Sequence, residues 1–168
     1  MRRLLNALYA GSAWLAALSM VGVLLMVMLT IISRFFGFAA PGTDAYAGYA
    51  MAGAGFMALA STLKAGEHIR VTLILGMLKG RAYKALELAA LAIATLLSGF
   101  LAFYASRLVW QSWEIEDISV GIDATPLWIP QIFMALGTLV FFIAFCDELI
   151  LEIRGQRKAS STQDAHHE

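Results

Sequence analysis

Four long stretches without a charged side chain divide this sequence, and each is 19 to 30 residues long. The hydrocarbon core of a bilayer, about 30 Å thick, is crossed by about 20 residues of α-helix. Only a helix or a closed barrel satisfies its backbone hydrogen bonds in lipid, and the alternating segments of about 10 residues expected of a barrel are missing. We therefore predict an all-α membrane protein with four transmembrane helices, at about residues 11–33, 45–63, 87–107 and 127–147.

The segment between the second and third predicted spans contains an apolar run, residues 72–78, that is too short to cross a membrane. Apolar side chains recur here at the spacing of one helix face, at Val71, Ile74, Leu75 and Leu78. Basic residues that suit anionic headgroups follow, at Lys79, Arg81 and Lys84. We predict a short amphipathic helix that lies in the membrane interface.

The two ends of the chain differ in character. The first apolar stretch is much longer than the 7–15 residues of a signal-peptide core, so we expect it to be retained as a helix. The last residues are polar and unpatterned, which is typical of disorder. We therefore predict a four-helix transmembrane domain over residues 1–155 and a disordered cytoplasmic tail over residues 156–168.

Composition supports the membrane assignment: 60% of the residues are hydrophobic and 14% are charged, against about 45–50% and about 25% in soluble domains. The net charge is zero, so there is no basic excess for binding nucleic acid. The single cysteine, Cys146, excludes an intrachain disulfide and a multi-cysteine metal site.

The basic residues are distributed unequally between the two sides that four spans define. Ten lie on the side of the termini and of the 64–86 loop, whereas only Arg34 and Arg107 lie on the other side. Because basic loops stay in the cytoplasm, we expect both termini to be cytoplasmic. The opposite side carries an acidic loop with Glu114, Glu116, Asp117 and Asp123.

Four tryptophans lie near the ends of the predicted spans, where amphipathic rings sit at the headgroup level. We interpret them as membrane-interface anchors: Trp14, Trp110, Trp113 and Trp128. This role sets the depth of the helices and implies no binding site.

Small residues follow one face of the second and of the third span. The positions that matter most are Ala50, Ala54 and Ala58 in the second, and Gly99 and Ala102 in the third. Small faces let helices approach closely in lipid, where no hydrophobic effect drives association. We expect these two faces to pack on each other or on a partner protein.

Chemistry-bearing groups are absent from the spans. None carries an acid or a base at its centre, so no ion or proton path is evident, and paired histidines, a phosphate-binding loop and a nucleophile–base set are also missing. We therefore expect no enzyme activity, no cofactor and no metal. His68 fits a capping or loop hydrogen bond better than a proton switch.

One motif carries a family resemblance. Lys64-x-Gly66-x-His68-Ile69-Arg70-Val71 follows the second span directly, Arg34-Phe35 closes the first, and Pro126-Leu127-Trp128-Ile129-Pro130 opens the fourth. In these features the chain resembles the DctQ-type small membrane subunit of tripartite ATP-independent periplasmic (TRAP) transporters, over roughly residues 10–152. It departs from the family at Thr72 and near Asp44, where acidic residues are frequent.

The resemblance implies a role in a sodium-driven symporter of the bacterial inner membrane that imports an organic anion of the carboxylate or dicarboxylate type. A large membrane subunit would carry the substrate, and a periplasmic binding protein would deliver it. The small subunit would be a scaffold in the lipid bilayer, and the acidic loop would help to dock the binding protein. The alternatives are a stand-alone structural or assembly protein without a transport role, and an autonomous four-helix channel.

Overall fold

The computed structural model describes residues 2–64, 81–121 and 124–154 of the chain. Four long helices account for most of them: α1 (Arg2–Phe36), α2 (Thr43–Lys64), α4 (Arg81–Glu114) and α5 (Trp128–Ile153). In the described ranges the only β-type pairing is one isolated bridge between Ile118 and Pro126. The all-α prediction is confirmed.

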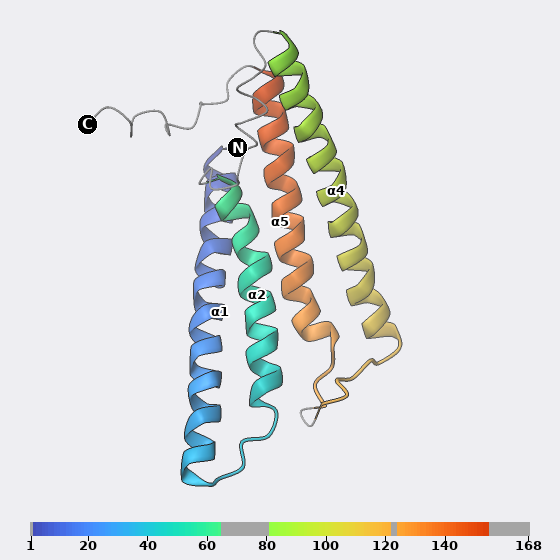
Figure 1. Ribbon diagram of the computed structural model, residues 1–168. Coiled ribbons are helices and arrows are strands. Elements are labelled where there is room, and N and C mark those ends of the chain that lie inside the picture. The colour runs from blue at the N-terminus through green and yellow to red at the C-terminus, as the bar shows by residue number, and fades with distance from the viewer. Residues whose placement is uncertain (1, 65–80, 122–123, 155–168) are drawn as a thin grey trace, which may run out of the picture.

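The helices stand in a row that is one helix thick rather than in a closed bundle. Helix α1 packs on α2, α2 packs on α5, and α5 packs on α4, while α1 barely touches α5. Within the described part of the chain, α4 contacts neither α1 nor α2. Figure 1 shows the resulting order α1, α2, α5, α4, in which α1 and α4 run down the picture and α2 and α5 run up it. Along the helix axes the layer has two ends. We call the one where α2 ends at Lys64 the Lys64 end, and the one where α4 ends near Trp113 the Trp113 end.

The observed helices extend beyond the predicted spans. Helix α1 continues to Phe36 and ends in a turn in which Gly37, with φ of 70°, lets the Phe38 amide donate to the Ser33 carbonyl at 3.1 Å. Helix α4 begins at Arg81, so Arg81 and Lys84 belong to this helix and not to a separate interfacial segment. Such extensions are expected, because charged residues end a membrane span without ending a helix.

Three of the four helices are long and apolar enough to cross a membrane, over Arg3–Phe36, Lys84–Glu114 and Trp128–Ile153. Helix α2 is not among them, so the predicted span 45–63 stays a prediction. Its 22 residues measure about 33 Å, which is long enough to cross a bilayer. Many of them are Ala and Gly, which suits a helix that lies between α1 and α5 and turns little of its surface to lipid.

Helices α1 and α2 meet along a seam of small and polar side chains. Most of the buried and half-buried positions of α1 recur at alternating spacings of three and four residues, at Tyr9, Ser12, Ala16, Ser19, Val23, Met26, Thr30 and Ser33. Contacts advance steadily along the antiparallel pair, from Gly22 near Ala50 to a hydrogen bond of 2.9 Å between the Thr30 and Thr43 hydroxyls. This heptad-like spacing is typical of helices that supercoil around each other.

Most Ser and Thr hydroxyls of the described helices donate to a carbonyl of their own helix. Ser12 donates to the Tyr9 carbonyl at 2.9 Å, and Thr138 donates to the Met134 carbonyl at 3.0 Å. In lipid an unpaired hydroxyl would cost several kcal/mol. These side chains therefore serve helix packing and leave no open polar path through the described part of the layer.

Candidate functional site

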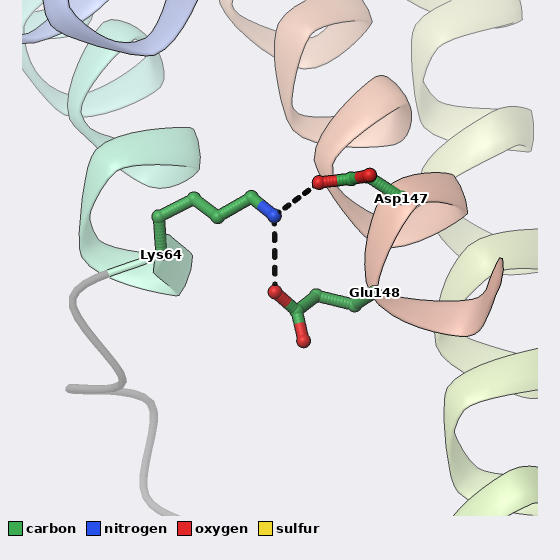
Figure 2. A network of polar contacts seen from close by, with 3 residues as sticks. All are labelled: Lys64, Asp147 and Glu148. Atoms are coloured by element: carbon green, nitrogen blue, oxygen red, sulfur yellow. Dashed lines mark hydrogen bonds and ion pairs between the residues drawn. The ribbon is translucent and has the colours of Figure 1, made fainter. Parts of the chain in front are cut away.

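The main polar cluster of the described structure lies at the Lys64 end, between α2 and α5. Lys64 is the last residue of α2, and its ammonium reaches across to two consecutive acids of α5. Its Nζ lies 3.0 Å from Glu148 Oε1 and also donates to Asp147 Oδ2. Figure 2 shows the three side chains converging from the two helices. The cluster ties together residues more than 80 positions apart in the sequence.

A third helix takes part in this cluster through Tyr9 of α1. The Lys64 Nζ lies 5.1 Å from the centroid of the Tyr9 ring, which is within the range of a cation–π interaction. The ring is 6% exposed and packs with Ala60 and Ala144, both of which are completely buried. Because alanine is small, α1, α2 and α5 converge here closely enough for the lysine to reach all three partners.

The electrostatics of the cluster favour the charged lysine. Partial burial disfavours the ammonium, but the hydrogen bonds and charges of Asp147 and Glu148 outweigh it and raise the pKa of Lys64 above its ordinary value. Lys64 lies just beyond the predicted span 45–63, at the end where the chain leaves α2. The cluster is therefore a stable ion-paired junction at neutral pH.

The sequence singled out Lys64 as the first residue of the family motif but gave it no partner. The structure supplies Asp147, Glu148 and Tyr9, which sequence reasoning missed. A signal was available, because Lys64 stands at the end of one predicted span and Asp147 and Glu148 stand at the end of another, on the same predicted side. The other motif residues lie outside the described residues, as does the predicted interfacial run 72–78: Gly66, His68, Arg70 and Val71.

The small residues predicted to form interfaces have different environments. Ala54 and Ala102 are each 4% exposed and are buried inside this chain, whereas Ala50, Ala58 and Gly99 are half-buried. The two small faces do not pack on each other, because α2 and α4 are separated by α5. That alternative is wrong, since α5 inserts between them. Contact with a partner stays a prediction for the half-buried positions.

One glycine that the sequence did not single out, Gly137, sets how closely α5 approaches α2, and a second, Gly53, lies where α2 meets both α1 and α5. A Cβ built on Gly137 would lie 2.6 Å from the backbone carbonyl carbon and oxygen of Phe56. A Cβ on Gly53 would lie 3.4 Å from the Ser19 hydroxyl and 3.7 Å from Phe133. Gly137 therefore allows the backbones of α2 and α5 to come into direct contact, as small residues do between membrane helices.

The Trp113 end carries the acidic residues predicted to dock a partner. Glu114 closes α4, and Glu116 and Asp117 follow in a turn in which the Asp117 amide donates to the Ser112 carbonyl at 3.0 Å. Glu116 adopts φ of 51°, the conformation that Gly37 adopts after α1. A residue with a side chain costs about 1–2 kcal/mol more than glycine there. Asp123 lies outside the described residues.

The loop between α4 and α5 has a defined shape on both sides of residues 122–123. The Ser119 amide donates to the Thr125 carbonyl at 2.8 Å, and the Leu127 amide donates to the Asp117 carbonyl at 2.9 Å. Thr125 also approaches the Tyr46 hydroxyl of α2 at 3.4 Å. Val120, at the turn, is completely exposed. The loop therefore projects apolar as well as acidic side chains from the Trp113 end.

The predicted anchors Trp110, Trp113 and Trp128 gather at this same end. Trp113 and Trp128 pack edge to face with their ring centroids 4.9 Å apart, so they also join α4 to α5. Trp110 and Trp14 are largely exposed, in agreement with contact with headgroups. Their anchoring role stays a prediction.

Searched over the described ranges, the structure has no group of three or more His, Cys, Asp and Glu that could hold a metal ion. The acids that come together do so around Lys64, where their charge is offset by the ammonium. The arrangement is suited to joining helices and to presenting surfaces, and it positions no nucleophile against a base in the part of the chain described.

Comparison with known proteins gives one family match. The model of the family described as "Tripartite ATP-independent periplasmic transporters, DctQ component" matches residues 23–155, well over half of the chain. The matched region extends from the middle of α1 to the end of α5 and includes the Lys64 cluster. No curated protein gives a significant match.

Proposed function

Because the chain belongs to the DctQ family of TRAP transporter components, we propose that it is the small scaffold subunit of a sodium-driven importer of an organic anion. In this proposal a large membrane subunit carries the substrate and sodium sites, and a periplasmic binding protein delivers a carboxylate or dicarboxylate. The small subunit enlarges the fixed frame against which the transport domain moves. It is held in the bacterial inner membrane with both termini in the cytoplasm.

The single observation that carries the scaffold role is the one-helix-thick row. A substrate path needs a wall on every side, and a row in which α4 contacts only α5 encloses none in the described residues. In the described residues its cross-helix ion pairs gather at the Lys64 end, and most of its Ser and Thr hydroxyls bond to carbonyls of their own helices. A layer of this kind supports a neighbour but cannot by itself translocate a charged solute.

The apolar surface of the row supports the proposal of a large membrane partner. Even in the middle of α1, side chains such as Leu24 and Leu25 are about 60% exposed. Lipid covers part of this surface. A layer with two broad faces also leaves one face free to pack on another membrane protein, which is the arrangement expected of a scaffold.

Transport in proteoliposomes tests this function. The large subunit and the binding protein are reconstituted with and without this chain, and uptake of a labelled dicarboxylate is measured under an inward sodium gradient. We expect uptake only when the chain is present. Uptake that is unchanged by its omission would show the scaffold role to be wrong, whereas uptake that persists without the sodium gradient would refute only the sodium coupling.

The acidic loop at the Trp113 end is proposed to assist docking of the binding protein. Complementary charges at the rim of an interface act mainly on the association rate, and salt screens them. Glu114→Lys should therefore slow association at low ionic strength. Asp44→Lys is the matched control, because Asp44 is an exposed acid in the first turn of α2 and lies outside the α4–α5 loop. Equal association rates for the two variants would count against docking at the loop.

A further inference from the structure

An open groove of about 440 Å³ lies between α4 and α5, in the half of the layer nearer the Trp113 end. Six of its lining residues come from one face of α4 and one comes from α5: Leu101, Tyr104, Ala105, Arg107, Leu108, Gln111 and Met134. The spacing of the α4 residues follows the helix repeat, so the groove runs along the helix axis.

The lining is mostly apolar and becomes more polar toward the end of α4. Leu101, Tyr104 and Ala105 line the deeper part, and Arg107, Leu108 and Gln111 line the part nearer the end of α4. From Leu101 to Gln111 the helix rises about 15 Å. This is half of the about 30 Å hydrocarbon core of a bilayer. The groove therefore has the length and the polarity gradient of one membrane leaflet.

Arg107 marks the polar part of the groove. It is exposed, and the structure gives it no hydrogen bond or ion pair within the described residues. The lysine at the opposite end of the layer, by contrast, is held by two carboxylates. A guanidinium beside apolar surface at the edge of the membrane is suited to an anionic headgroup. Trp110, one turn away and largely exposed, is the type of residue that sits at the headgroup level.

We propose that this groove binds an anionic phospholipid, with one acyl chain along Leu101 and Ala105 and the phosphate at Arg107. Arginine binds phosphate oxygens through its fork of N–H donors. The Tyr104 hydroxyl and the Gln111 amide lie at i−3 and i+4 from Arg107, on the same side of α4, and supply further donors to the headgroup.

A lipid fits the groove better than a helix of a partner protein. A helix with its side chains is about 10–12 Å across and would not enter a groove of this volume. An acyl chain is slender and flexible, and its phosphate supplies the negative charge that Arg107 lacks in the described structure. The proposal does not depend on the transport role of the protein.

Native mass spectrometry of the full chain in detergent tests the site. Phosphatidylglycerol and phosphatidylcholine with the same acyl chains are added in turn, and the fraction of protein that retains one lipid is measured. We expect the wild type to prefer phosphatidylglycerol. Arg107→Gln should weaken retention of phosphatidylglycerol about fivefold and remove the preference, as expected for one basic residue near an anionic headgroup. Arg107→Lys should keep most of it.

Arg34→Gln is the matched control, because Arg34 lies at the corresponding end of α1 and lines no part of the groove. If Arg34→Gln retained as little phosphatidylglycerol as Arg107→Gln does, the proposal would be overturned, since the effect would then come from the overall charge of the protein. Met134→Trp narrows the groove at the level of Arg107 and should reduce retention of both lipids. Unchanged retention in this variant would place the lipid elsewhere. If Met134→Trp instead lost the large subunit on co-purification while its lipid retention stayed unchanged, the groove would be occupied by a protein.

Discussion

The contact between Gly137 of α5 and Phe56 of α2 makes the most demanding test of the helix order. In Gly137→Ala the new Cβ would lie 2.6 Å from the carbonyl carbon and oxygen of Phe56 and 2.9 Å from its Cβ. Carbon atoms attract one another best at about 3.5–4.0 Å. The atoms that would be struck belong mainly to the backbone, so no change of rotamer relieves the overlap. The two helices must instead move apart by about 1 Å.

Overpacking of this kind costs about 1–3 kcal/mol. We expect Gly137→Ala to lower the free energy of unfolding by about 2 kcal/mol, because α2 and α5 are both central in the row and cannot separate without loosening the neighbouring contacts. A truncation at Phe56 should not rescue the variant, since the carbonyl group remains.

Thermal unfolding of the full chain in detergent provides the measurement, and two glycines provide graded controls. A Cβ on Gly99 would meet the Phe142 ring at 3.0 Å, and this side chain can turn aside, so Gly99→Ala should cost less than about 1 kcal/mol. A Cβ on Gly55 would meet nothing within 4 Å, so Gly55→Ala should be neutral or stabilising by up to about 1 kcal/mol. If Gly137→Ala and Gly55→Ala have the same melting temperature, the close approach of α2 and α5 is refuted.

Three further outcomes follow from the two ends of the layer. Lys64→Met leaves two acids of α5 without their ammonium partner and should cost about 1–3 kcal/mol in thermal unfolding, whereas the exposed Lys84→Met should cost almost nothing. Because its partners raise the pKa of Lys64 above 10.5, the ion pair should stabilise the fold fully below that pH. The stabilisation should be lost only as the pH rises through the higher folded-state pKa, a loss that an alkaline pH series of melts should show in the wild type and not in Lys64→Met. Glu116→Gly should raise the free energy of unfolding by about 1 kcal/mol, because glycine relieves the positive φ. Gly37→Ala should lower it by a similar amount at the matching turn after α1. If both variants melted at the wild-type temperature, this interpretation of the turns would be contradicted.

Helix type and approximate position could be predicted from the sequence because both depend on neighbouring residues. An uncharged stretch of about 20 residues favours a membrane helix wherever it occurs. The predicted spans were shorter than the observed helices, because residues such as Arg3 and Glu114 end a membrane span but are readily accommodated in a helix. The span predicted for α2 is the exception, because this Ala- and Gly-rich helix contains no stretch as apolar as those in the other three helices.

The candidate site could be predicted only in part. Lys64 was identified from its motif, but its partners Asp147 and Glu148 are more than 80 residues away, and no local pattern joins them. The small faces of α2 and α4 looked equivalent in the sequence. Their environments differ because α5 separates them, so Ala54 and Ala102 are buried by different neighbours.

The order of residues is enough to predict that the chain forms long apolar helices, that they begin and end near its charged residues, and that its basic residues concentrate on one predicted side. These properties follow from the free energy of moving each segment from water into lipid, which depends on that segment alone. The helix order α1, α2, α5, α4 and the junction at Lys64 are established only in the folded protein. Helices that are all apolar gain little from burial against one another in lipid, so their order depends on shape, as at Gly137 and Phe56, and on a few polar contacts. Such complementarity exists only between surfaces that folding brings together.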